Sequence, residues 1–161
     1  LVHLNMYRIK HLPPDIVVLI AEHCPNLRTL ASRCLRACPN NALILQNCVH
    51  LEKLYIELSY LQDESLEFLE RIAAHCKDLR LLCLCYNFCG GAFDKPTIPI
   101  LLSNPHLHTV AVESRDIFSR YQKRSVNFIN YVDCMKKDLG INIDDHLDDW
   151  VVHEDEFFED F

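Results

Sequence analysis

Apolar residues recur along most of the chain in a short phrase, a leucine followed in most units by apolar residues three and five positions later. The phrase begins at Leu27, Leu51, Leu79 and Leu107, which are 24, 28 and 28 residues apart, and the start of the chain at Leu1 fits the same frame. Such a phrase puts two apolar side chains on one side of a strand, and a single strand cannot bury them alone. The pattern therefore predicts about five stacked units in residues 1–118, each with a strand near its start.

The second half of each unit is expected to be helical. The clearest segment runs from Asp63 to His75, where Leu66, Leu69 and Ile72 fall at helical spacing and Asp63 is a suitable N-cap. Another helix should follow the two prolines before Asp15, since proline is tolerated in the first helical turn, and end at His23. Shorter helices are expected at 42–46 and 96–102. Alternating strands and helices predict an α/β solenoid with parallel strands on its concave face and helices on its convex face.

The pattern changes after the fifth expected strand. Apolar residues from Phe118 to Leu139 form a broad stripe at helical spacing, and Gly140 suits a helix C-cap. A stack of repeats needs an atypical terminal unit to cover its open end. Residues 119–140 are therefore expected to form a helical cap.

Residues 141–161 form an acidic tail that also contains aromatic side chains. The tail has nine Asp and Glu residues and no Lys or Arg, together with Trp150, Phe157 and Phe158. One interpretation is a disordered, solubilising tail. Acidic and aromatic residues together are also typical of a segment that folds onto a partner's groove. A third interpretation is that Trp150 packs back on the cap.

Charge and cysteine content narrow the classes of function. The net charge is −7, but removing the nine tail residues from 23 acidic residues leaves 14 against 16 basic ones. A nearly neutral body gives no electrostatic footprint for nucleic acid, and no apolar run approaches the length of a membrane span. Nine cysteines, an odd number, do not indicate a disulfide framework in a chain of this length. We expect reduced thiols, and hence the cytosol or the nucleus.

One phrase of the third unit carries a resemblance to a known family. Cys48-x-x-Leu51-x-x-Leu54-x-Ile56, followed by Asp63-Glu64-x-Leu66, resembles the cysteine-containing repeat of F-box/leucine-rich-repeat proteins. Cys24-Pro-Asn-Leu27 resembles it too. The resemblance covers residues 1–118, and it implies that the repeats select a protein substrate for ubiquitination. It also implies that an F-box recruits the Skp-type adaptor of a cullin ubiquitin ligase.

The F-box itself is expected to lie outside this sequence. The segment from His11 to Ile20 resembles the opening of an F-box, but the next repeat phrase begins four residues later, at Cys24, and leaves no room for three helices. We therefore expect the sequence to be a piece of a longer protein with an F-box upstream of Leu1. A leucine-rich-repeat scaffold with no link to ubiquitin is the alternative.

The expected partner surface follows from the alternation of side chains along a strand. Counting the first leucine of each unit as position one, positions three, five and seven point away from the core. Tyrosine and arginine are enriched where binding energy concentrates. The candidate protein-binding residues of the concave face are Tyr7, Arg33, Tyr55, Glu57 and Glu113, with Trp150, Phe157 and Phe158 in the tail.

Enzymatic and metal sites are not expected. Cys83-x-Cys85 with Cys89 supplies thiols of the type that zinc binds, but a structural zinc site needs four convergent ligands and no second pair has the right spacing. The alternative, core or groove thiols, is favoured. His23 and His75 each precede a repeat cysteine at equivalent places, which indicates packing or solvation, whereas a catalytic dyad would be unique. We expect no catalytic residue, no cofactor and no metal.

Overall fold

The structure is a computed structural model, which describes residues 1–9, 12–33, 35, 40–58, 63–86, 103–112 and 126–141. Within these ranges six strands form one all-parallel sheet in the order of the sequence. The strands are β1 (His3–Met6), β2 (Thr29–Ser32), β3 (Lys53–Leu58), β4 (Leu81–Tyr86), β5 (Thr109–Val112) and β6 (Asn127–Asn130). The helices are α1 (Pro14–His23), α2 (Asn41–Asn47), α3 (Asp63–His75) and α6 (Tyr131–Leu139). The expected α/β class with parallel strands is confirmed.

The register of the sheet follows the repeat frame of the sequence. His3 pairs with Thr29, Thr29 with Lys53, Lys53 with Leu81 and Leu81 with Thr109, so position three of every unit meets position three of the next. Position two continues the ladder across the units. The backbone N–H of Glu52 donates to the Arg28 carbonyl at 2.8 Å, and that of Arg80 donates to the Glu52 carbonyl at 2.8 Å.

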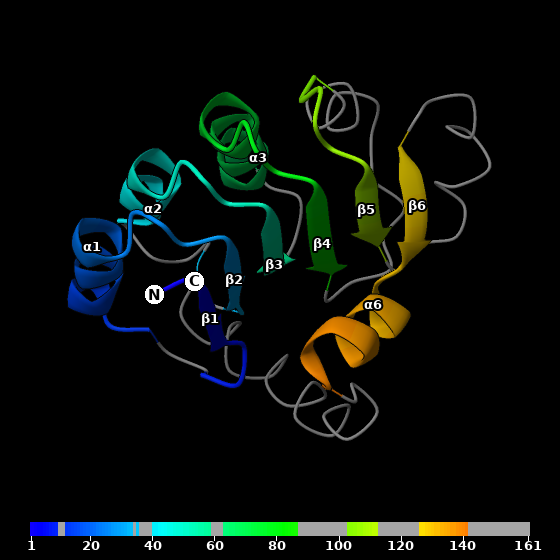
Figure 1. The fold of residues 1–161 in the computed structure, drawn as a ribbon, viewed down its shortest axis with the longest axis horizontal. Coiled ribbons are helices and arrows are strands. Elements are labelled where there is room, and N and C mark those ends of the chain that lie inside the picture. The colour runs from blue at the N-terminus through cyan, green and yellow to red at the C-terminus, as the bar shows by residue number, and fades with distance from the viewer. Residues whose placement is uncertain are drawn as a thin grey trace, which may run out of the picture.

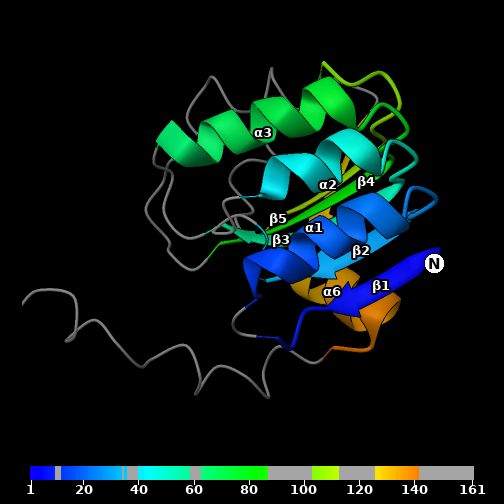
Figure 2. The same cartoon turned by 90° about the vertical axis from the view of Figure 1, so that its left-hand side faces the viewer.

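Helices α1, α2 and α3 lie side by side over one face of the sheet, called here the outer face (Figures 1 and 2). Their apolar stripes and alternate strand residues share one core, in which the repeated leucines are almost fully buried. The leading members are Val17, Ile20, Leu27, Leu30, Ile44, Leu45, Leu51, Leu54, Phe68, Leu69, Leu79, Leu82, Leu107 and Val110. The helix expected over 63–75 has these same bounds, and α2 extends one residue beyond 42–46 at each end.

The expected helical cap is only partly correct. Residues 127–130 form a strand, in which Asn127 pairs with Thr109 and Phe128 with Val110, and the helix begins at Tyr131. The open edge of β5 presents backbone N–H and C=O groups that need hydrogen-bond partners. Pairing with them stabilises a strand over 127–130, although the apolar side chains have helical spacing. The Asn130 side chain accepts from the Val132 N–H at 2.8 Å and caps the helix. Gly140 ends it in the left-handed conformation, with φ 64°, as the sequence predicts.

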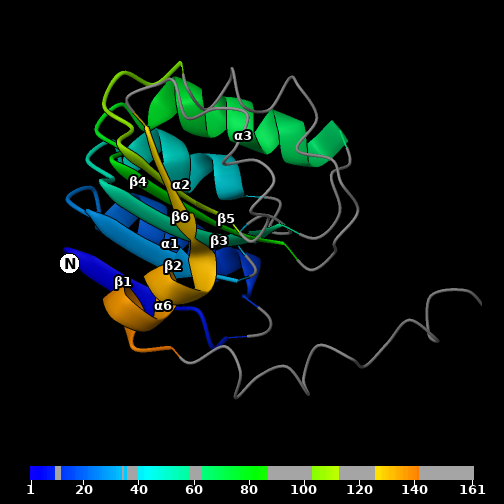
Figure 3. The same cartoon turned by 90° about the vertical axis from the view of Figure 1, so that its right-hand side faces the viewer.

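Helix α6 lies on the opposite face of the sheet, called here the inner face, and the strands curve around it (Figures 1 and 3). It contacts β4, β5 and β6. A second apolar cluster, separate from the outer core, forms between this helix and position five of the strands. None of the helices in the described ranges is both long and apolar enough to cross a lipid bilayer.

Candidate functional site

The inner face carries a row of mostly small side chains at position five of successive units. Ala31, Cys83 and Ala111 are small, Tyr55 stands among them, and all four are at most 1% exposed. The row exists because position five alternates with the leucines of positions four and six, which point into the outer core. Small side chains on either side of Tyr55 let the α6 backbone approach the sheet closely. The inner face is therefore a shallow apolar floor with one large phenol in it.

The Asp138 carboxylate of α6 makes polar contacts with the inner face. The Tyr55 hydroxyl donates to Asp138 Oδ2 at 2.6 Å, and Lys53 Nζ lies 3.4 Å from the same oxygen. Burial raises the pKa of the Tyr55 phenol, and the hydrogen bond to Asp138 raises it further. The buried hydroxyl is thus satisfied by a charged acceptor, which makes a stronger bond than a neutral one.

Two thiols meet under the same helix. Cys83 of β4 donates a hydrogen bond to Cys134 of α6, which holds the pKa of the Cys134 thiol below its ordinary value although burial opposes the shift. Both cysteines are buried, and neither forms a disulfide. The apolar surroundings are completed by Tyr131, Met135 and Ile141. These contacts fix α6 on the inner face without any covalent link.

The structure places the sequence-predicted binding residues in three different situations. Tyr55 is fully buried and Tyr7 is 5% exposed, so α6 and its cluster separate them from a partner in this structure. Arg33 and Glu57 lie toward the carboxyl ends of the neighbouring strands β2 and β3, where Arg33 Nε is 2.5 Å from Glu57 Oε2. Each therefore neutralises the charge of the other. The remaining candidates, Glu113, Trp150, Phe157 and Phe158, lie outside the described residues, as does the helix expected over 96–102.

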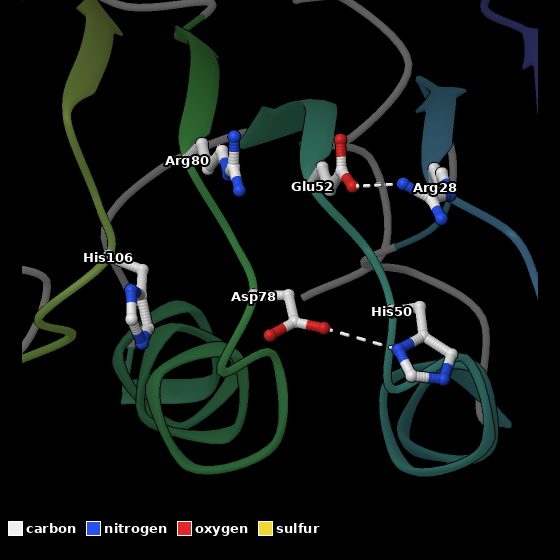
Figure 4. A pocket seen from close by; sticks show the side chains of 6 residues that line it. All are labelled: Arg28, His50, Glu52, Asp78, Arg80 and His106. Atoms are coloured by element: carbon white, nitrogen blue, oxygen red, sulfur yellow. Dashed lines mark hydrogen bonds and ion pairs between the residues drawn. The ribbon is translucent and has the colours of Figure 1, made fainter.

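A second group of polar residues, which we call the charged rim, lies where the chain enters the strands (Figure 4). It lines a cavity of about 230 Å³ and comprises Arg28, His50, Glu52, Asp78, Arg80 and His106. Arg28 Nη1 lies 2.6 Å from Glu52 Oε1, and His50 Nδ1 lies 3.2 Å from Asp78 Oδ2. Figure 4 shows both pairs joining neighbouring units, with the Arg80 and His106 side chains beyond them.

Sequence reasoning missed the charged rim, although a signal for it exists. Arg28, Glu52 and Arg80 occupy position two of successive units, so their charges alternate in sign at the repeat period. Position two directly precedes the strand, where the alternation rule used for positions three to seven does not apply. Comparing the same position in all units reveals this series of alternating charges.

The repeat cysteines have a structural role. The Cys48 thiol donates to the Cys24 carbonyl at 3.4 Å, and in the last of these units Asn104 Nδ2 donates to the Cys76 carbonyl at 2.7 Å. Burial raises the pKa of Cys48 to about 11 and that of Cys76 to about 12. A thiol that stays protonated at neutral pH is a poor nucleophile and a poor metal ligand. Of the cysteines weighed as zinc ligands, Cys83 is buried as a core thiol, and Cys89 lies outside the described residues. Cys48, Cys76 and Cys134 are buried as well.

Other chemistry finds no assembled site in the described ranges. Among those residues, no three His, Cys, Asp or Glu side chains converge in a way that could hold a metal ion. His23 and His75 end α1 and α3, at the equivalent places that the repeat predicts. In comparisons with known proteins, no family model, no curated protein and no solved structure matches this chain.

Proposed function

We propose that this chain is the leucine-rich-repeat part of a protein-binding subunit, which acts by binding and not by catalysis. In this proposal the parallel strands form the concave face of a solenoid and α1, α2 and α3 its convex face. The repeats hold a protein substrate, while an F-box elsewhere in the protein recruits a Skp-type adaptor and a cullin for ubiquitination. The resemblance of the third unit to the F-box/leucine-rich-repeat family supplies the ubiquitin part of the proposal.

The observation that carries the proposal is the register of the sheet. Equivalent residues of five units pair with one another from β1 to β5, and the Cys48 and Asn104 side chains bond each to the preceding unit. A surface built by such stacking repeats its side chains as columns across several units. It offers an extended strip, which suits a protein partner better than a small molecule, since small molecules are bound in enclosed pockets.

The charged rim supports a protein partner as well. Its charges alternate at the spacing of adjacent strands, about 4.8 Å, so a partner with the complementary order of charges would be selected in one register. Substitutions of rim charges therefore provide a structural test of where the partner lies. The free thiols of Cys48 and Cys76 fit a reducing compartment, and their raised pKa values fit an unreactive, structural role.

The experiment is affinity purification of the full-length parent protein from its own cells, followed by mass spectrometry. Co-purification of a cullin and its adaptor together with one further enriched protein supports the ligase proposal and supplies the substrate candidate. If neither ligase component appears while another protein is strongly enriched, the chain is a scaffold unrelated to ubiquitin. If no protein is enriched above the background of the purification, the binding proposal itself is overturned.

A pair of charge reversals locates the partner surface. Arg80→Glu changes the charged rim, whereas Glu70→Arg changes an exposed residue of α3 on the outer face. We expect the first substitution to reduce recovery of the enriched partner about tenfold or more, because a like charge then faces the partner. The second should leave recovery unchanged. Equal recovery with both variants would show that the partner does not use the rim.

A further inference from the structure

Helix α6 contacts the inner face of the sheet through a regularly spaced set of side chains. Tyr131, Cys134, Met135 and Asp138 follow one another at spacings of three, one and three residues, so they form one stripe along the helix. The first three are buried, and Asp138 makes the polar contact with Tyr55. Anchors at i, i+3, i+4 and i+7 are the pattern with which an amphipathic helix lies in a groove of a partner protein.

The opposite side of α6 faces solvent. Asp133, Lys136 and Lys137 are exposed, so no described element packs on that side of the helix. The helix touches the sheet through this face, where Ile141 is also buried and where Val132 and Leu139 pack at the margin. It is nine residues long, and helices of this length are marginal on their own in water. The helical conformation of α6 therefore depends on its packing against the sheet.

The inner face has the complementary features of such a groove. Small residues on β2, β4 and β5 form its floor, the Tyr55 phenol projects from the middle, and Lys53 stands at its side. The phenol and the ammonium group converge on one carboxylate oxygen. A helix that fits as α6 does carries apolar anchors at i, i+3 and i+4 and a carboxylate three residues after the last of them.

We propose that the inner face is a groove for an amphipathic helix of the protein partner, and that α6 occupies it as an intramolecular substitute for that helix. This inference rests on the proposed protein-binding function and adds the class of ligand. Binding of the partner helix then requires α6 to leave the inner face. The apparent affinity for the partner is therefore the affinity of the open groove multiplied by the fraction of molecules in which α6 is undocked.

The first measurement follows the opening of α6 through thiol alkylation of the full chain. Cys134 is the single cysteine of the tryptic peptide spanning residues 125–136, and Cys76 is the single cysteine of the peptide spanning 72–77. Asp138→Ala removes the polar anchor, so we expect Cys134 to be alkylated at least tenfold faster while Cys76 in the outer core stays protected. Asp133→Ala makes the same change on the exposed side of α6, and it should leave both rates as they are.

The second measurement uses a fluorescein-labelled peptide of residues 127–141 as the probe, with binding followed by fluorescence anisotropy. The peptide should bind the Asp138→Ala chain more tightly than the unsubstituted chain, in which α6 competes. A peptide that itself carries Asp138→Ala should bind at least tenfold more weakly, because Tyr55 and Lys53 then lack their acceptor.

Two outcomes overturn the proposal. Fast alkylation of Cys134 without any binding of the peptide would mean that an opened inner face accepts no separate helix. Joint alkylation of Cys76 and Cys134 in Asp138→Ala, and again in the milder Tyr55→Phe, would mean that α6 is inseparable from the fold. Either result leaves the purification experiment untouched, so co-purifying partners would then bind elsewhere, for example on the charged rim.

Discussion

Asn104 stands where the three preceding units have a cysteine, and its contacts explain the exchange. Its Nδ2 donates to the Cys76 carbonyl at 2.7 Å, and its Oδ1 accepts from the His106 N–H at 3.0 Å. A thiol is a weak donor and does not provide the second contact as an amide oxygen does. Cys48 bonds to the preceding unit at 3.4 Å. Cys48 and Asn104 therefore share one feature, a side-chain donor to the carbonyl of the preceding unit, which a thiol and an amide can both supply.

The phenol of Tyr55 makes the free energy of unfolding depend on pH in the alkaline range. Burial and the hydrogen bond to Asp138 raise the pKa of this phenol above its ordinary value of 10, so the folded chain keeps a proton that the unfolded chain loses above pH 10. The contribution of this phenol to the free energy of unfolding should therefore be constant below that pH and fall as the pH rises further. Urea unfolding between pH 8 and about 11 measures this fall.

Tyr55→Phe separates this effect from that of the buried thiols. The raised pKa values of Cys48 and Cys76 act in the same direction from about pH 9 upward, so part of the alkaline loss remains in the variant. The variant should be less stable at pH 8, because Asp138 loses a hydrogen bond, but its stability should fall less steeply above pH 10. An unchanged slope in Tyr55→Phe would show that the phenol is not responsible.

At the scale of elements, the first five strands were predictable because each carries its own hydrophobic signal. Leu51 and Leu79 mark the strands that follow them, and the stripe of Leu69 and Ile72 gives α3 its bounds. Strand β6 has no such phrase, and it pairs Asn127 with Thr109 after only 18 residues. Its formation depends on the unpaired edge of β5, which is a property of the assembled sheet.

The position of α6 could not be predicted for a different reason. Alternation places Tyr55 on the face away from the leucines, but it does not say whether solvent, a partner or another part of the chain covers that face. The contact that decides it joins Tyr55 to Asp138, residues 83 positions apart. The sequence therefore predicted the face on which Tyr55 lies, but not that α6 of the same chain covers it. The charged rim was missed because equivalent positions of successive units were not compared.

Gly140 tests how firmly α6 is held. It adopts φ 64°, and a Cβ added there would meet no atom within 4 Å, so a substitution acts through backbone conformation alone. Gly140→Ala should destabilise the docked helix by about 1–2 kcal/mol, because the left-handed conformation is unfavourable for alanine. Hydrogen exchange should then become faster for the amides of α6 while those of β3 keep their protection.

Gly140→Asn is the matched control for this cap. Asparagine tolerates the left-handed conformation better than alanine does, so most of the protection of α6 should return. Equal acceleration of exchange in α6 and β3 by Gly140→Ala would contradict separate opening of the helix. In that case α6 and the sheet would unfold as one cooperative unit.

For the molecule as a whole, the two apolar clusters divide the sheet between its faces. The outer core joins α1, α2 and α3 to the sheet, and the inner cluster joins it to α6. Among the described elements β1 and β6 are the edge strands, and α1 is the first of the outer helices (Figure 1). The two edges of the sheet are unlike, so contact between β1 of one copy and β6 of another would be heterologous, whereas contact between two copies of the same patch would be isologous and would close as a dimer.

Helix α1 exposes apolar side chains, and we expect them to mediate self-association of residues 1–161. Leu19 and Ile16 of this helix are 49% and 39% exposed. Sedimentation velocity should show association that increases with concentration, because burying this patch removes apolar surface from water. Leu19→Glu should shift the chain to monomer, whereas Val49→Glu, which changes an equally exposed residue between α2 and β3, should not. A chain that is monomeric at every concentration would contradict the prediction, and equal effects of the two substitutions would place the contact elsewhere.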